Sequence, residues 1–129
     1  MIANPTRRAF LEAIRVAADL IGTPAVAERW NEPSALAELS VGGLAGHLAR
    51  AANTVETYLD RGVPEHTTEP LSAPRYFAAQ PLSADPGSEL NSAVRARGEQ
   101  AASAGVAQVV AGLEGCRQRL VERLAVEPA

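Results

Sequence analysis

Three side chains in this sequence are histidine or cysteine, which ligate metals or move protons near neutral pH: His47, His66 and Cys116. His47 lies in the middle of residues 41–59, which should form the most apolar helix of the protein. An imidazole there is costly unless a hydrogen bond or a metal ion satisfies it. We therefore expect the ring of His47 to point into the helical interior and to have a partner.

The spacing around His47 leaves room for such a partner. Residues advance by about 100° each along a helix, which sets His47 beside the apolar stripe that contains Leu44 and Leu48. Its own row holds the small residues Gly43, Ala51 and Thr54. Small neighbours make space around the ring, as a ligand site needs. A hydrogen-bonded core histidine is nevertheless the more frequent outcome for an isolated histidine in this setting.

The other chemical candidates have simpler interpretations. His66 follows Glu65 in a proline-rich stretch and is expected to be a solvated loop residue. Cys116 falls on the apolar face of a helix, where cysteine behaves as a small hydrophobic side chain. No Gly-x-Ser-x-Gly elbow is present, so a nucleophilic triad is not indicated. Gly42-Gly43 opens a helix whose N-terminus could hold an anion, although no strand precedes it and no lysine accompanies it.

Composition indicates a single globular domain. The chain has 129 residues, of which 47% are apolar and 21% charged, and all 12 of its positive side chains are arginine. Arginine without lysine is typical of a GC-rich bacterial genome. The net charge of −3 gives no basic face for nucleic acid, and no apolar run approaches the roughly 20 residues of a membrane span. The single cysteine excludes an internal disulfide and fits the cytoplasm.

Capping residues and apolar periodicity predict an all-α fold. Helices are expected over 5–21, over a short turn at 25–30, from a Ser40 cap to about residue 59, from 89, and over 106–124, with Gly105 separating the last two. The predicted buried stripes are Phe10, Ala13, Ile14, Ala17, Leu20 and Ile21; Val41, Leu44, Leu48, Ala51, Val55, Tyr58 and Leu59; Leu90, Ala93, Val94 and Ala101; and Val109, Val110, Leu113, Cys116, Leu120, Val121 and Leu124.

Residues 62–87 form a long proline-rich connection that is expected to be irregular, with Arg75-Tyr76-Phe77 packing back on the body. The expected architecture is an up-down bundle of three to four helices in one domain, residues 1–129, with this connection between helices 2 and 3. Because only about three helices are long, we interpret the chain as an incomplete four-helix bundle that leaves an apolar groove open.

The segment from Trp30 to Ala51 contains a recognisable pattern: Trp30, then Pro33-Ser34, Leu36, Ser40-Val41 and Gly46-His47-Leu48-Ala49-Arg50. This pattern resembles the N-terminal, metal-binding domain of mycothiol-dependent maleylpyruvate isomerase and its actinobacterial relatives, within the DinB-like group of four-helix proteins. Residues 93–105 are also similar to a later segment of that family. The resemblance spans nearly the whole chain.

The resemblance implies a role for His47 as the first of three protein ligands to a divalent metal, most often zinc, with mycothiol as a possible co-substrate. The other two ligands of the family are a carboxylate and a histidine four residues apart on a later helix. No Glu-x-x-x-His follows Leu124 here, so we expect the last helix of the family pattern to be lacking. We expect an incomplete metal site in a single chain.

Three hypotheses follow. The first is a thiol-dependent isomerase or S-transferase domain, isomerase-like by resemblance, in which His47 is a partial metal ligand. The second is a non-catalytic helical module that forms a homodimer or binds a protein through the open groove, and polar substitution at Leu113 or Leu120 should disrupt it. The third is a bundle that binds a small thiol or another small molecule without a metal.

Overall fold

The computed structural model of the chain describes residues 2–66, 69–80 and 84–128. These residues form helices and no extended strand, which confirms the all-α prediction; one isolated bridge joins Pro33 and Ser40. The helices are α1 (Pro5–Ile21), α2 (Pro24–Glu28), α3 (Val41–Arg61), α4 (Ala73–Ala78), α5 (Glu89–Ala102) and α6 (Val106–Val126).

The helix starts follow from local capping chemistry. The side chain of Asn4 accepts hydrogen bonds from the amides of Thr6 and Arg7, and Pro5 occupies the first position of α1. Ser40 and Ser88 cap α3 and α5 in the same way. Gly105 separates α5 from α6 with a φ of 93°, which a residue with a side chain rarely adopts. The predicted boundaries of the long helices are confirmed within about two residues.

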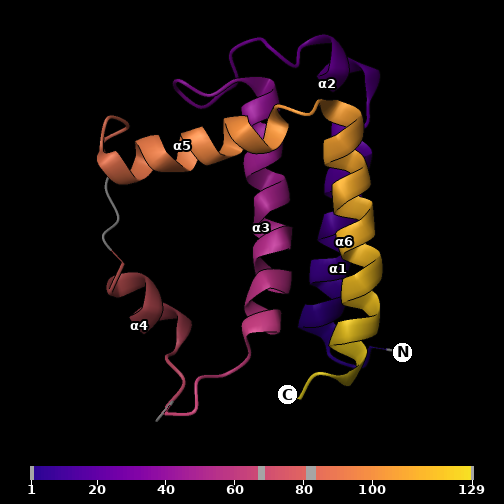
Figure 1. Cartoon of the computed structure of the whole chain (residues 1–129), viewed down its shortest axis with the longest axis vertical. Coiled ribbons are helices and arrows are strands. Elements are labelled where there is room, and N and C mark those ends of the chain that lie inside the picture. Colours follow the sequence, from indigo (N-terminus) through magenta and orange to yellow (C-terminus); the bar gives the residue numbers. More distant parts are fainter. Residues whose placement is uncertain (1, 67–68, 81–83, 129) are drawn as a thin grey trace.

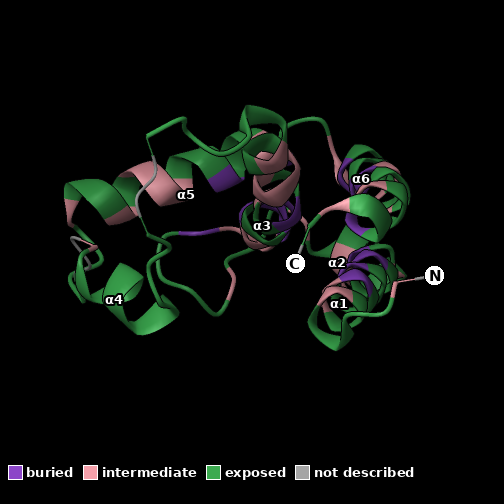
Figure 2. Cartoon of the chain, turned by 90° about the horizontal axis from the view of Figure 1, so that it is seen from below, coloured by how far each residue is buried: buried purple, intermediate pink, exposed green. Residues whose placement is uncertain are grey.

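Three long helices form the body of the molecule. α1, α3 and α6 run along its length, and α6 packs on both of the others (Figure 1). α5 lies across one end of α3 instead of running beside it, and this crossing is the most extensive helix contact. Among the described residues, no fourth long helix runs alongside the three. The buried faces of α1, α3 and α6 turn towards one another, whereas α4 is exposed (Figure 2).

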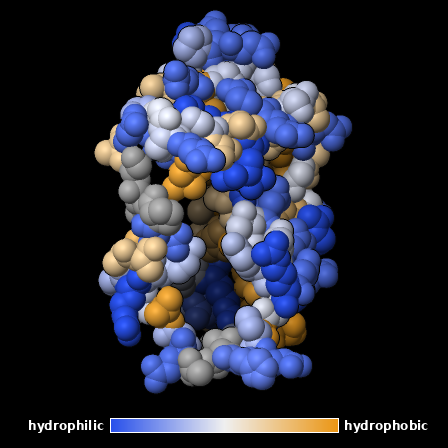
Figure 3. All heavy atoms as spheres, turned by 60° about the vertical axis from the view of Figure 1, so that its left-hand side comes forward, coloured by the Kyte–Doolittle hydropathy of each residue, from blue (hydrophilic) through white to orange (hydrophobic). Residues whose placement is uncertain are grey.

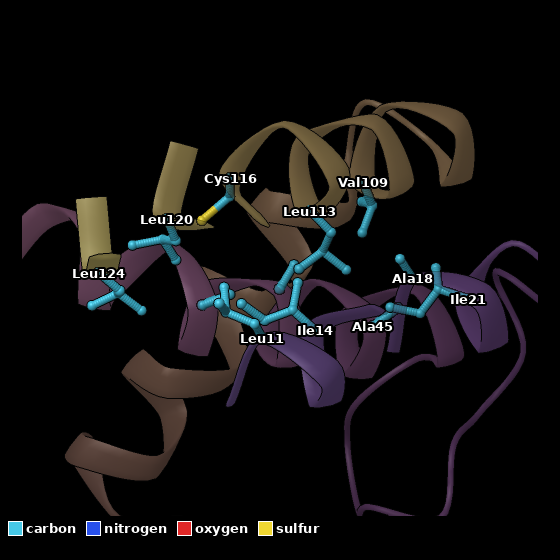
Figure 4. Packing of buried hydrophobic residues seen from close by; sticks show 12 residues of the cluster. Leu11, Ile14, Ala18, Ile21, Ala45, Val109, Leu113, Cys116, Leu120 and Leu124 are labelled. Carbon is cyan, nitrogen blue, oxygen red and sulfur yellow. The ribbon is translucent and has the colours of Figure 1, made fainter. Parts of the chain in front are cut away.

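The core lies between these three helices. Leu113, Cys116 and Leu120 of α6 are the most deeply buried large side chains, and they project towards Leu11 and Ile14 of α1 (Figure 4). The rest of the core cluster is Ala18, Ile21, Ala45, Ala49, Ala52, Val109 and Leu124. The predicted stripe of α6 is therefore confirmed except at two positions: Val110 is half-buried, and the prediction is wrong for Val121, which is 38% exposed.

The predicted stripes of α1 and α3 are partly wrong. In α1, Leu11 and Ala18 are buried, and the predicted Leu20 is exposed. In α3, the buried residues are the small ones, Gly42, Gly43, Ala45, Gly46, Ala49 and Ala52. The large residues Leu48 and Tyr58, which the prediction placed in the core, are 44% and 61% exposed. α3 thus turns its small side chains to its neighbours, because they let those helices approach closely.

The proline-rich connection at 62–87 is also more regular than predicted, because it contains α4. Arg75, Tyr76 and Phe77 belong to this helix and are exposed, so the expectation that they pack back on the body is wrong. Tyr76 and Phe77 instead contact each other edge to face. No helix in the described part of the chain combines the length and the apolar character that crossing a membrane requires. The cytoplasmic location stays a prediction.

Candidate functional site

His47 lies on the surface of α3. Its side chain is exposed, so the expectation that the ring points into the helical interior is wrong. The cause is the orientation of α3: its neighbours Ala45 and Ala49 face the core, which turns His47 outwards, towards the side where α5 crosses.

Glycines bring α3 and α5 into contact beside His47. A Cβ atom built on Gly46 would overlap the carbonyl oxygen of Gly98, and one built on Gly98 would lie 2.7 Å from the carbonyl oxygen of Gly43. The same Cβ would lie 3.2 Å from the Cβ of His47. The glycines of α3 therefore serve close helix packing, which is the simpler of the two explanations for such residues.

His47 borders a hollow between the two helices, which we call the His47 hollow. It has a volume of about 190 Å³ and is lined by His47, Arg50, Ala51 and Thr54 of α3 and by Val94 and Arg97 of α5. The surface is hollowed on the side of the molecule from which α5 projects (Figure 3). Ala51 and Thr54 are two of the small residues that share the row of His47, so the space predicted around the ring is present.

A second hollow continues along α3. This Arg61 hollow has a volume of about 350 Å³, shares Arg50 and Thr54 with the first, and extends to Tyr58 and Arg61. The guanidinium carbon of Arg61 lies 5.4 Å from the centre of the Tyr58 ring, a cation–π distance. Asn53, Thr57 and Ala101 complete its lining.

The loop before α3 has a structural role. The carbonyl oxygens of Trp30 and Glu32 accept hydrogen bonds from the amides of Gly42 and Val41, and the hydroxyl of Ser40 accepts one from Gly43. A Cβ on Gly42 would lie 2.7 Å from the Trp30 ring. These contacts satisfy the first amides of α3, so its N-terminus has no free donors for an anion.

Glu99 of α5 closes this end of α3. Its carboxylate accepts hydrogen bonds of 2.8 Å from both the amide and the hydroxyl of Ser40. These hydrogen bonds hold the crossing of α3 and α5 in place. They also occupy both oxygens of the Glu99 carboxylate.

The other candidate residues lie elsewhere. His66 is exposed in the loop after α3, as predicted. Cys116 is fully buried, and burial, followed by the nearby carboxylate of Glu56, raises the pKa of its thiol to about 11. A buried, protonated thiol is neither a good nucleophile nor a good metal ligand.

A further hollow has most of its charges paired. It lies between α3 and α6 and has a volume of about 520 Å³. Its residues Arg119 and Glu56 form an ion pair, as do Arg123 and Asp60, 3.0 Å apart. The Arg119 guanidinium, by its hydrogen bonds, holds the pKa of the Glu56 carboxyl below its usual value. These pairs join α3 to α6 and neutralise four of the five charged groups that line the hollow, the fifth being Glu122.

The residues around His47 do not fit a divalent metal ion. Among the described residues, no group of three His, Cys, Asp or Glu side chains is placed to hold one. The charged groups that line the hollow with His47 are the guanidiniums of Arg50 and Arg97, which would repel a cation. The role of His47 as a metal ligand stays a prediction, and its surroundings do not favour it.

The sequence did not identify the α5 side of the hollow, Val94 and Arg97. Nothing in the sequence distinguishes Arg97 from the other arginines, and Val94 was assigned to an apolar stripe. Gly98 was the available signal, because a glycine inside a helix often marks the close approach of another backbone. Its partner helix could not be read from the sequence.

Fold and site together define an all-α domain with an open hollow where two helices cross. The sequence profile of the mycothiol maleylpyruvate isomerase N-terminal domain matches residues 10–129, and the chain belongs to this family. This confirms the resemblance found in the sequence. No curated protein and no solved structure matches the chain significantly.

Proposed function

We propose that this chain is a ligand-binding domain of its family, and that it holds a small organic molecule in the His47 hollow without a bound metal ion. The observation that carries the proposal is the hollow itself, which opens between α3 and α5 and presents His47, Arg50 and Thr54 to solvent on one helix face. All three side chains can hydrogen-bond a polar ligand.

The family motif supports this proposal residue by residue. Gly46 permits the crossing with α5, Ala49 is buried in the core, and His47 and Arg50 line the hollow that the crossing creates. Four residues of the motif thus serve three purposes: the helix crossing, the core and the lining of the hollow. The imidazole of His47 can donate or accept a hydrogen bond to a bound ligand.

Mycothiol is the first ligand to test, because the family name contains it. We expect mycothiol to shift the backbone amide signals of residues 47, 50, 51, 54 and 97 in a ¹H–¹⁵N NMR titration, in a saturable way. His47→Ala should weaken this response. His66→Ala is the matched control, because its imidazole is exposed in a loop away from the hollow, and it should change nothing.

The proposal fails if neither mycothiol nor any other small molecule of a broad panel shifts the signals of the hollow in a saturable way. It also fails if the shifts appear but are the same in His47→Ala, since the ligand would then sit elsewhere.

A homodimer is the second candidate function, and the exposed large side chains of α3 favour it. Leu48, at 44% exposure, and Tyr58, at 61%, lie on the face that the small-residue packing leaves outside. Leu113 and Leu120 are core residues, so polar substitution there would unfold the chain instead of testing an interface. Leu48→Gln is the appropriate variant. Sedimentation equilibrium should show a dimer that Leu48→Gln weakens, and a monomer up to millimolar concentration would dismiss this candidate.

A further inference from the structure

Arginines without acidic partners gather along one side of α3. Within the described part of the chain, Arg50, Arg61 and Arg97 make no ion pair or hydrogen bond. Elsewhere most guanidiniums are engaged: Arg7, Arg15, Arg95, Arg117, Arg119 and Arg123 all bind a carboxylate or a backbone carbonyl. Of the six guanidiniums without such a partner among the described residues, three line the two adjoining hollows, and Arg8, Arg29 and Arg75 lie elsewhere.

The lining of these two hollows carries positive charge from arginine and no negative charge from a carboxylate. None of the described residues that line the His47 hollow or the Arg61 hollow is an aspartate or a glutamate. The chain as a whole carries a net charge of −3, so the charge of these two adjoining hollows, which together form a trough, is opposite in sign to that of the whole molecule. Charges held together in a concave surface attract a counter-ion more strongly than scattered ones.

Arg50 and Arg97 line one hollow from two different helices. Arg50 comes from α3 and Arg97 from α5, on either side of the same hollow of about 190 Å³. The crossing that holds them is fixed by the Gly46–Gly98 contact and by the tie from Glu99 to Ser40. Two planar guanidiniums that face one space can bind an oxyanion with paired hydrogen bonds. Thr54 adds a hydroxyl donor beside them.

We infer that the His47 hollow is an oxyanion site, in which Arg50 and Arg97 bind the carboxylate or phosphate group of a small ligand. The site thus has the opposite charge preference from the divalent metal that the resemblance implies for His47. This inference rests on the proposed function and names the charged group of its ligand. Arg61 lies at the far end of the trough, about 16 Å from Arg50 along the axis of α3 at 1.5 Å per residue.

The test is an NMR titration of the whole chain with four probes at constant ionic strength: succinate, inorganic phosphate, neutral succinamide and zinc chloride. Succinate or phosphate should shift the amides of residues 47, 50, 54 and 97 to saturation, and the tighter of the two identifies the group. Succinamide should bind at least about fivefold more weakly, since it lacks the charge.

Charge variants locate the binding. Arg50→Gln and Arg97→Gln should each weaken the better anion by about fivefold. Arg8→Gln removes an exposed guanidinium of α1 that has no partner and should leave the affinity unchanged. The spectra themselves report whether each variant is folded.

The inference is overturned if the anions bind equally well to Arg50→Gln and Arg97→Gln, or if succinamide binds as tightly as succinate. In that case mycothiol could still shift the hollow, and the proposed function would stand alone. If no probe and no thiol shifts the hollow, both fall. Zinc that shifts the same amides while the anions do not would also overturn the inference.

Discussion

Gly46 and Gly98 leave no room for a side chain where α3 crosses α5. A Cβ on either residue would meet backbone atoms of the other helix, and backbone cannot rotate away as a flexible side chain can. The site beside His47 exists because this crossing is tight. Its stability therefore depends on two residues that carry no functional group.

Gly46→Ala is expected to lower the free energy of unfolding by about 2 kcal/mol, because overpacking a close contact outweighs the better helix propensity of alanine. Gly112→Ala in α6 is the matched control. No atom beyond its own stretch of α6 lies within 4 Å of the Cβ it would add, and it should raise the stability by about 0.5 to 1 kcal/mol. Urea denaturation measures both values. A Gly46→Ala variant as stable as the parent would show that the crossing is looser than described.

Cys116 links stability to alkaline pH. The pKa of its thiol is 9.0 when unperturbed and is raised to about 11 in the folded chain, by burial first and then by Glu56. A raised folded pKa means that stability is fully present below the unfolded pKa and is lost as the pH rises through the folded one.

Between about pH 9 and pH 11 the parent should therefore lose of the order of 2 kcal/mol that Cys116→Ala does not lose. Urea midpoints across this range compare the two proteins. Parallel pH profiles for the parent and the variant would rule out a buried, protonated thiol.

At the scale of the helix, the sequence predicted where elements begin and end far better than which faces they bury. The boundaries depend on local chemistry, such as Asn4-Pro5, the Ser40 cap and Gly105. The face of α3 depends on which neighbour approaches it. α3 carries one apolar face of small residues and another that includes Leu48 and Tyr58, and periodicity alone favours the larger side chains.

The same limit applies to the site. The sequence identified His47 and the small residues around it, because both lie on one helix and helical spacing relates them. It could not bring Arg97 to Arg50, since no local rule fixes where α5 crosses α3. That His47 shares its hollow with two positive guanidiniums, where the resemblance implied a bound cation, therefore becomes visible only in the folded chain.

The tie between α5 and the start of α3 has a measurable energy. Ser40→Ala removes a helix cap and should cost about 1 kcal/mol. Glu99→Ala removes the acceptor of both hydrogen bonds from Ser40. Because the two residues act together, the double variant should lose less stability than the sum of the single losses.

Ser88→Ala provides the control for this cycle, because Ser88 caps the opposite end of α5 and makes no contact with Glu99. Its effect should add to that of Glu99→Ala within about 0.5 kcal/mol. Thermal or urea unfolding of the two cycles decides the matter. Additivity in the Ser40–Glu99 cycle would mean that the tie contributes nothing to the crossing.

At the scale of the whole molecule, three long helices supply the core and α5 extends outwards from it. The residues that stabilise the fold are therefore different from the residues that line the hollow. The core lies between α1, α3 and α6, whereas the hollow lies on the opposite side of α3, under α5. Residues of the hollow can therefore be changed with little loss of stability, which makes the site open to direct measurement.

The exposed His47 stands among guanidiniums and is not one of a set of metal ligands, and isothermal titration of the chain with zinc can decide this. We expect no saturable binding of one zinc equivalent that depends on His47, so the parent and His47→Ala should give the same weak heats. Binding of one zinc ion per chain that is lost in His47→Ala and kept in His66→Ala would contradict it.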